Sequence, residues 1–167
     1  MMKAKYWQSE IVPSHWGISS LSNVCEKITD GSHFSPERQT FGKKYITVSD
    51  VYNDEIHFDS ALCISEKDFN QLAKNGCQPE VNDVLLSKDG TVGRRSVVRD
   101  NDFVVLSSLG ILRPKKILTS SFLKYSLDAE IMQEQMRSTM AGSALRRITL
   151  KKNSSTSNSN SSINRTT

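Results

Sequence analysis

The stretch DVLLSKDGTVGRRSVV, residues 83–98, is the part of the sequence that best predicts the fold. An apolar run leads to Asp89-Gly90, and a second run rich in valine closes the stretch. Asp-Gly between two such runs predicts a β-hairpin with a type I′ turn, because both central positions of that turn need a positive φ. We therefore expect strands over 81–87 and 92–98.

The tip of this hairpin carries hydrogen-bond donors and cations with no evident acid–base partner: Ser87, Lys88, Thr91, Arg94 and Arg95. Lysine and arginine neutralise phosphates, and arginine can also bind guanine through two hydrogen bonds. The tip therefore favours a polyanionic ligand. The alternative is that the two arginines only keep a strand edge soluble.

Composition places the chain among ordinary soluble proteins. Its 167 residues are 37% hydrophobic and carry a net charge of +4, which fits one domain with a core and a short appendage. Because it has no apolar run of about 18 residues, we expect no membrane span. The three cysteines lack metal-ligand spacing and are expected to be free thiols, so we expect a soluble, cytoplasmic protein.

Charge is unevenly distributed along the chain. Residues 50–68 hold six acidic residues and one lysine, whereas 113–116 and 146–152 are basic. We therefore expect an acidic area and a separate basic area on the surface, although such runs are most often solvated faces without a function.

The rest of the chain predicts further short elements. Ser20 and Ser65 are expected to begin helices, the second ending at Gly76. Strands are expected near 26–29, 45–51, 55–58, 103–113 and 145–151, and a long exposed loop over 30–44. The clearest helix follows Thr119-Ser120 and ends at Gly142. Its buried stripe is predicted to be Phe122, Tyr125, Ala129, Met132, Met136 and Met140.

The two ends of the chain have a different character. Residues 1–15 resemble an irregular leader. Residues 153–167 have a single apolar residue, Ile163, and are predicted to be disordered.

The sequence offers little for catalysis. Three histidines (His15, His33 and His57) share no ligand spacing, and neither a Walker loop nor a GxGxxG opens a helix. We therefore expect a non-catalytic protein without a cofactor or metal. Polar and basic loops instead favour nucleic acid. The candidate DNA contacts are Ser32, His33, Lys43, Lys44, Lys88, Thr91, Arg94, Arg95, Arg146 and Arg147.

Six motifs, in order, give a resemblance to a known family. They are ITDGSH, YITVSDV, ISEKDFNQL, DVLLSKDGTVGRRSVV, SSLGILRP and GSALRRITLKK. Together they resemble a target-recognition domain of a type I restriction-modification specificity subunit, over residues 16–152.

The resemblance implies an α+β fold with a curved, partly barrel-like, mostly antiparallel sheet and a few packed helices, one of them long and near the C-terminus. It implies a non-catalytic subunit that chooses the double-stranded DNA sequence. Such a subunit docks methyltransferase subunits, which methylate adenine with S-adenosylmethionine, and motor-nuclease subunits. It normally holds two recognition domains spaced by long helices.

This sequence departs from the family pattern in three places. Asn82 replaces a glycine before the DVLLS strand, a change we expect to be harmless because asparagine tolerates a positive φ. A second recognition domain and the spacer helix are missing, and a polar tail stands in their place.

We therefore expect a truncated domain. One hypothesis is that loss of one A from an A-rich run near Lys151–Asn153 would restore the family junction, so the tail is a frameshift product; the alternative is a natural low-complexity tail. A rival function is a protein-interaction module, or an inactive remnant, that pairs with a methyltransferase subunit or another specificity fragment.

Overall fold

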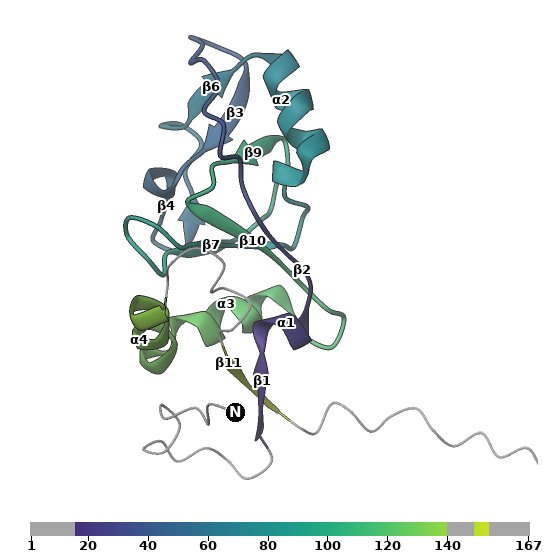
Figure 1. The fold of residues 1–167 in the computed structure, drawn as a ribbon, viewed down its shortest axis with the longest axis vertical. Coiled ribbons are helices and arrows are strands. Elements are labelled where there is room, and N and C mark those ends of the chain that lie inside the picture. The colour runs from purple at the N-terminus through teal and green to yellow at the C-terminus, as the bar shows by residue number, and fades with distance from the viewer. Residues whose placement is uncertain (1–15, 140–148, 154–167) are drawn as a thin grey trace, which may run out of the picture.

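The computed structural model of the chain describes residues 16–139 and 149–153. Two main sheets follow one another along its longest axis, with α2 beside the smaller sheet and the other helices beyond the larger one (Figure 1). The mixed α+β class with mainly antiparallel strands is confirmed. The sheets are not closed into a barrel.

The larger sheet has four antiparallel strands in the order β2-β10-β7-β8. They are β2 (Cys25–Asp30), β10 (Leu109–Pro114), β7 (Val84–Ser87) and β8 (Arg95–Val97). Every residue of β7 is buried, as expected for an apolar strand covered on both faces. Because side chains alternate along a strand, Val84 and Leu86 enter one core cluster, and Leu85 enters another.

Helices cover one face of this sheet. They are α1 (Leu21–Val24), α3 (Ser120–Asp128) and α4 (Glu130–Thr139). Leu123, Leu127, Met132 and Met136 from α3 and α4 are fully or almost fully buried in the cluster that contains Val84. The apolar residues of these helices therefore seal the larger sheet on that side.

The smaller sheet has the order β6-β3-β9 and lies toward the opposite end (Figure 1). Its strands are β6 (Leu62–Ile64), β3 (Lys43–Ile46) and β9 (Phe103–Val105), and β3 pairs with β9 in parallel. Helix α2 (Glu66–Leu72) packs on this sheet through Phe69 and Leu72. As predicted, Ser65 caps α2 by accepting the Asp68 N–H, and the chain turns at Gly76, with a φ of 84°.

Two short ribbons complete the described fold. Strands β4 (Val51–Tyr52) and β5 (Glu55–Ile56) form one hairpin after a 3-10 turn at Val48–Asp50. Strands β1 (Trp16–Ser20) and β11 (Thr149–Asn153) pair along their full length. None of the helices in the described ranges is long and apolar enough to cross a membrane.

Three sequence predictions about these elements are wrong. The strand expected over 45–51 ends at Ile46, and the 3-10 turn at Val48–Asp50 follows it. The long helix is broken at Ala129, whose ψ of 135° is not helical. The buried side of the helix therefore differs from the prediction: Tyr125 is 63% exposed, and Leu123 is buried instead. The single strand expected over 103–113 is two strands, because a turn over 106–108 separates β9 from β10.

Candidate nucleic-acid interface

The β7–β8 hairpin forms as predicted, but its turn is wider than expected. The strand register leaves residues 88–94 in the loop. Positive φ occurs at Gly90 (68°) and Gly93 (91°), and Asp89 has none. The predicted type I′ turn at Asp89-Gly90 is therefore wrong, since that turn needs both central residues at positive φ.

Ser87, which is completely buried, holds this wider loop together. Its hydroxyl donates to the Thr91 carbonyl at 2.5 Å and accepts the Arg94 N–H at 2.8 Å. Its own carbonyl accepts the Gly93 N–H at 3.0 Å. These bonds fold the loop back onto the end of β7, so Ser87 shapes the loop from inside.

Lys88 at the start of the loop is buried. It is 5% exposed, and its Nζ lies 2.9 Å from a carboxylate oxygen of Asp30 at the end of β2. A carboxylate therefore already neutralises Lys88. This ion pair joins the ITDGSH motif to the hairpin.

The residues after Asp30 pack against the β9–β10 turn. A Cβ on Gly31 would lie 2.2 Å from the Val105 carbonyl oxygen, so only glycine fits there. Ser32 is 5% exposed, donates its N–H to the same carbonyl at 2.7 Å, and donates its hydroxyl to the Phe34 carbonyl. Ser32 thus sits in the packed start of the first loop.

Arg95 also has acidic partners. Its Nη2 lies 3.2 Å from Asp54 and in close contact with Asp128 on α3, and its side chain is 14% exposed. Its Nη1 donates to the Gly93 carbonyl at 3.2 Å. Arg95 therefore ties the hairpin loop to both the β4–β5 ribbon and α3.

Arg94 has different contacts from those of Arg95. Its Nη1 donates to the Val48 carbonyl at 3.0 Å, and no carboxylate in the described part of the chain lies within ion-pair distance. Arg94 is half-buried and Thr91 is exposed. These two side chains are the accessible polar groups of the predicted hairpin site.

The other predicted residues are scattered. His33 is exposed and Lys44 is half-exposed on β3. Lys43 pairs with Asp102 at 2.8 Å, and this hydrogen bond raises the pKa of Lys43. Arg146 and Arg147 lie outside the described residues, as do the leader at 1–15 and most of the tail.

The β4–β5 hairpin was missed as part of the site. Tyr52 pairs with Glu55, and the intervening Asn53 and Asp54 have φ values of 52° and 63°, which define the type I′ turn that the sequence suggested elsewhere. The Asn-Asp pair between two short β-prone runs is the signal that could have located it.

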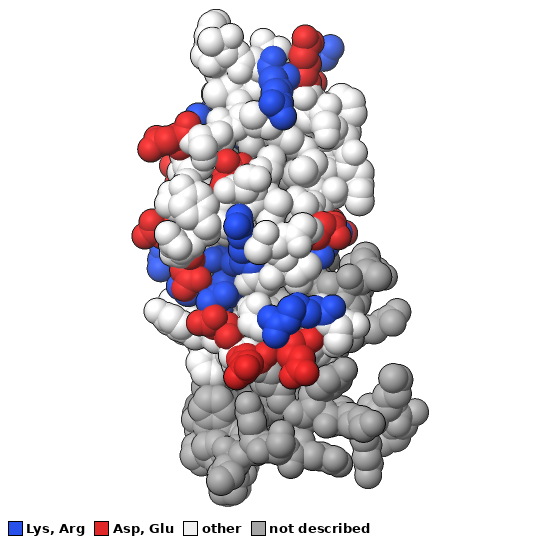
Figure 2. All heavy atoms as spheres, turned by 90° about the vertical axis from the view of Figure 1, so that its left-hand side faces the viewer, with Lys and Arg blue, Asp and Glu red and all other residues white. Residues whose placement is uncertain are grey.

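Asp54 links this turn to the larger sheet and to α3. Its carboxylate accepts the Lys124 Nζ at 3.0 Å and pairs with Arg95, and its carbonyl accepts the Ser96 hydroxyl at 2.9 Å. The expectation of separate acidic and basic areas is therefore wrong at this position, because carboxylates and cations interleave. Figure 2 shows acidic and basic side chains side by side at mid-height of the face that it draws.

Arg113, the first cation of the 113–116 run, is also neutralised. Its Nε and Nη2 donate to the two oxygens of Asp83 at 2.8 and 3.0 Å, and Asp83 is 1% exposed. A third nitrogen contacts Glu80 at 2.8 Å. Hydrogen bonding to Asp83 raises the pKa of Arg113. The two hydrogen bonds hold Arg113 against Asp83, the residue that precedes β7.

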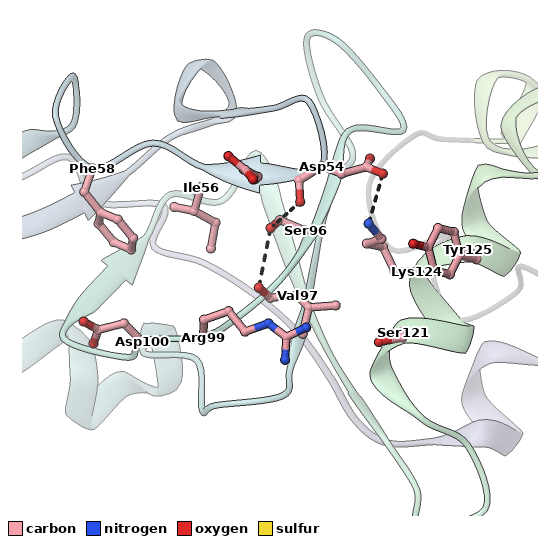
Figure 3. Close-up of a pocket in the computed structure, with 11 residues that line it drawn as sticks. Asp54, Ile56, Phe58, Ser96, Val97, Arg99, Asp100, Ser121, Lys124 and Tyr125 are labelled. Atoms are coloured by element: carbon pink, nitrogen blue, oxygen red, sulfur yellow. Dashed lines mark hydrogen bonds and ion pairs between the residues drawn. The ribbon is translucent and has the colours of Figure 1, made fainter.

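A hollow of about 390 Å³ lies beside the Asn53-Asp54 turn (Figure 3). The β5 ribbon, the end of β8 with the loop after it, and α3 form its walls. Arg99 and Tyr125 reach into it from opposite sides, and the bond between Lys124 and Asp54 closes one end (Figure 3). The lining combines donors, acceptors and an aromatic ring.

Other site chemistry is limited in the described residues. They contain no cluster of three or more His, Cys, Asp or Glu that could hold a metal ion. The three cysteines are free, and burial raises the pKa of the Cys25 thiol to about 12. Burial also raises the pKa of Cys77. Neither thiol has the lowered pKa of a reactive cysteine.

The arrangement of sheets and helices is similar to that of two solved proteins. The fold is similar to that of the HsdS subunit from Thermoanaerobacter tengcongensis, with a TM-score of 0.61 and 18% identity over 87% of this chain and 35% of that chain. It is also similar to the type I restriction-modification S subunit from M. genitalium, with a TM-score of 0.56 and 16% identity over 83% of this chain and 34% of that one. The chain thus spans about a third of the length of these solved chains.

The family comparison covers nearly all of the described fold. Residues 13–155 match the model of the type I restriction modification DNA specificity domain. This range contains both main sheets, both ribbons and all four α-helices of the described residues. The chain therefore belongs to the family of type I restriction-modification DNA specificity domains.

Proposed function

We propose that this chain recognises a DNA target and gives sequence specificity to a type I restriction-modification complex. The observation that carries the proposal is the family match, which extends over residues 13–155. The geometry supports it, because rigid, internally braced loops present polar side chains at the surface, and sites of this kind are held in place by locked surroundings.

The predicted contact residues divide by their surroundings. Ser32, Lys88 and Arg95 are embedded in internal hydrogen bonds or ion pairs, so we propose that they hold the loops in place. Thr91 is exposed and Arg94 has no carboxylate partner among the described residues. We propose that these two side chains, together with His33 and Lys44, contact DNA.

The partners follow from the same proposal. The matched part is only about a third of each similar solved chain, so we propose that a second specificity fragment, or a second copy, supplies another half-site. Methyltransferase and motor-nuclease subunits would supply the catalysis, and this chain would have none of its own.

Binding of the full chain to randomised DNA duplexes at low salt tests the function. We expect selection of one sequence motif, and an affinity that falls as salt rises because phosphate contacts release counterions. Arg94→Ala should reduce the salt slope by about one, whereas Arg38→Ala, in the exposed part of the first loop, should leave it unchanged. Binding without salt dependence or sequence preference would reject the proposal.

A further inference from the structure

Three hollows lie in series along the edge strand β8. The first is lined by Tyr52, Asn53, Asp54, Arg94 and Arg95. The central hollow beside it shares Asp54 with the first. The third shares Arg99 and Ser121 with the central one and extends to Lys115 and Lys116. We call this series the β8 furrow.

The cations of the β8 furrow differ in whether a carboxylate neutralises them. Arg95, Arg113 and Lys124 are committed to carboxylates. Arg94 in the first hollow and Lys115 and Lys116 in the third have no carboxylate within ion-pair distance among the described residues, and Lys115 donates to the Asn23 carbonyl. Counted over its lining residues, and with Glu26 included in the third, each outer hollow has one more cation than carboxylates.

Arg99 occupies the middle of the furrow with its donors unused. It is exposed, lines both the central and the third hollow, and extends along the central hollow toward Ser121 (Figure 3). Within the described ranges, its guanidinium has no hydrogen bond or ion pair. A guanidinium carries five N–H donors, so Arg99 offers a complete donor set to a ligand.

The walls around Arg99 favour a base edge over a phosphate. Glu55 and Asp100 line the central hollow and are exposed, so they repel a phosphate. They do not repel a neutral base, and carboxylates can accept the amino groups of cytosine. The ring of Tyr125, which is 63% exposed, adds a flat apolar surface at the same hollow.

These observations point to a specificity-determining residue. Resting on the proposed DNA-recognition function, we infer that Arg99 reads a guanine in the major groove through two hydrogen bonds to its O6 and N7 atoms. Arg94 and Lys116 bind the flanking phosphates. The Ser96–Asp54 and Lys124–Asp54 hydrogen bonds fix the walls of the central hollow that Arg99 enters.

The test compares motifs selected from randomised duplexes by the full chain and its variants. Arg99→Ala should lower discrimination at one G·C pair by about tenfold to a hundredfold, with the other positions unchanged. Arg99→Lys should not restore it, because an ammonium cannot make the paired contact. Lys116→Gln should weaken all sequences alike and reduce the salt slope by about one.

Arg137→Ala on the exposed side of α4 is the matched control and should change neither readout. Circular dichroism confirms that each variant is folded. If the wild-type chain selects no motif, the proposed function fails. If it selects a motif that Arg99→Ala retains unchanged, or if Arg99→Ala weakens all sequences alike, only the inference about Arg99 fails.

Discussion

The β4–β5 and β7–β8 hairpins lie side by side, joined by Arg95 and Asp54, yet they turn in different ways. The first uses a two-residue turn in which Asn53 and Asp54 both have positive φ. The second uses a longer loop in which only the glycines do. Both sequences have residues suited to a tight turn, and the more favourable pair, Asp89-Gly90, does not form one.

The difference shows that tertiary hydrogen bonds can override a local turn preference. Ser87 makes four hydrogen bonds to its own loop, and Arg94 donates from the loop to the Val48 carbonyl. Strands β4 and β5 have only two residues each, so the turn residues between them largely determine the shape of this hairpin. Three sets of substitutions test this difference between the two hairpins.

The largest effect is expected where the two hairpins are joined. Arg95→Ala should lower the free energy of unfolding by about 2–3 kcal/mol, because Asp54 and Asp128 lose the largely buried guanidinium that they share and Asp54 keeps only Lys124. Arg94→Ala should cost less than about 1 kcal/mol, since it removes one hydrogen bond at a half-exposed position. Urea unfolding measures both values, and equal losses would mean that Arg95 does not join the hairpins energetically.

A smaller effect is expected inside the wide loop. Ser87→Ala should cost about 1–2 kcal/mol, because the Arg94 N–H and the Thr91 carbonyl lose a buried partner. Ser108→Ala is the matched control: its hydroxyl is buried but has no hydrogen-bond partner among the described residues. Thermal unfolding should show a drop for the first variant and little or no drop for the second; the reverse order would contradict this role for Ser87.

The smallest effect is expected at the turn positions themselves. Asn53→Ala should cost about 1 kcal/mol, since alanine disfavours its φ of 52°, and Asn53→Gly should restore most of that loss. Asp89→Ala should change stability by less than about 0.5 kcal/mol, because Asp89 has no positive φ and is exposed. A larger loss at Asp89 than at Asn53, measured by chemical unfolding, would reverse the assignment of the two turns.

Local features of the fold were predictable from the sequence. The Ser65–Asp68 cap, the turn at Gly76 and the positive φ of Asn82, 75°, depend on a few neighbouring residues and are confirmed. The break at Ala129 was not predictable from periodicity. There the Gln133 amide donates to the Leu127 carbonyl at 2.7 Å and to the Gly93 carbonyl at 3.3 Å, so a contact with the distant hairpin loop stabilises the break.

The site was predictable only as a set of loops. Lys88 and Arg95 have the residue types of phosphate contacts, but their partners Asp30 and Asp54 are brought to them by strand pairing across long stretches of chain. No spacing rule indicates that such cations are already neutralised. Arg99 was overlooked for the converse reason: it belongs to none of the loops singled out, and its value comes from the hollow that distant segments build around it.

The position of β10 has a consequence for how the chain folds. This strand lies in the interior of the larger sheet, where it pairs with β7 and also with β2, so that Ile111 lies opposite Thr29. The four-stranded sheet cannot form completely until the chain has been synthesised past β10. The parallel β3–β9 pair also joins segments that lie far apart in the sequence. Contacts so distant in sequence slow folding, so we expect slow refolding and an aggregation-prone state while the apolar β7 edge lacks its partner.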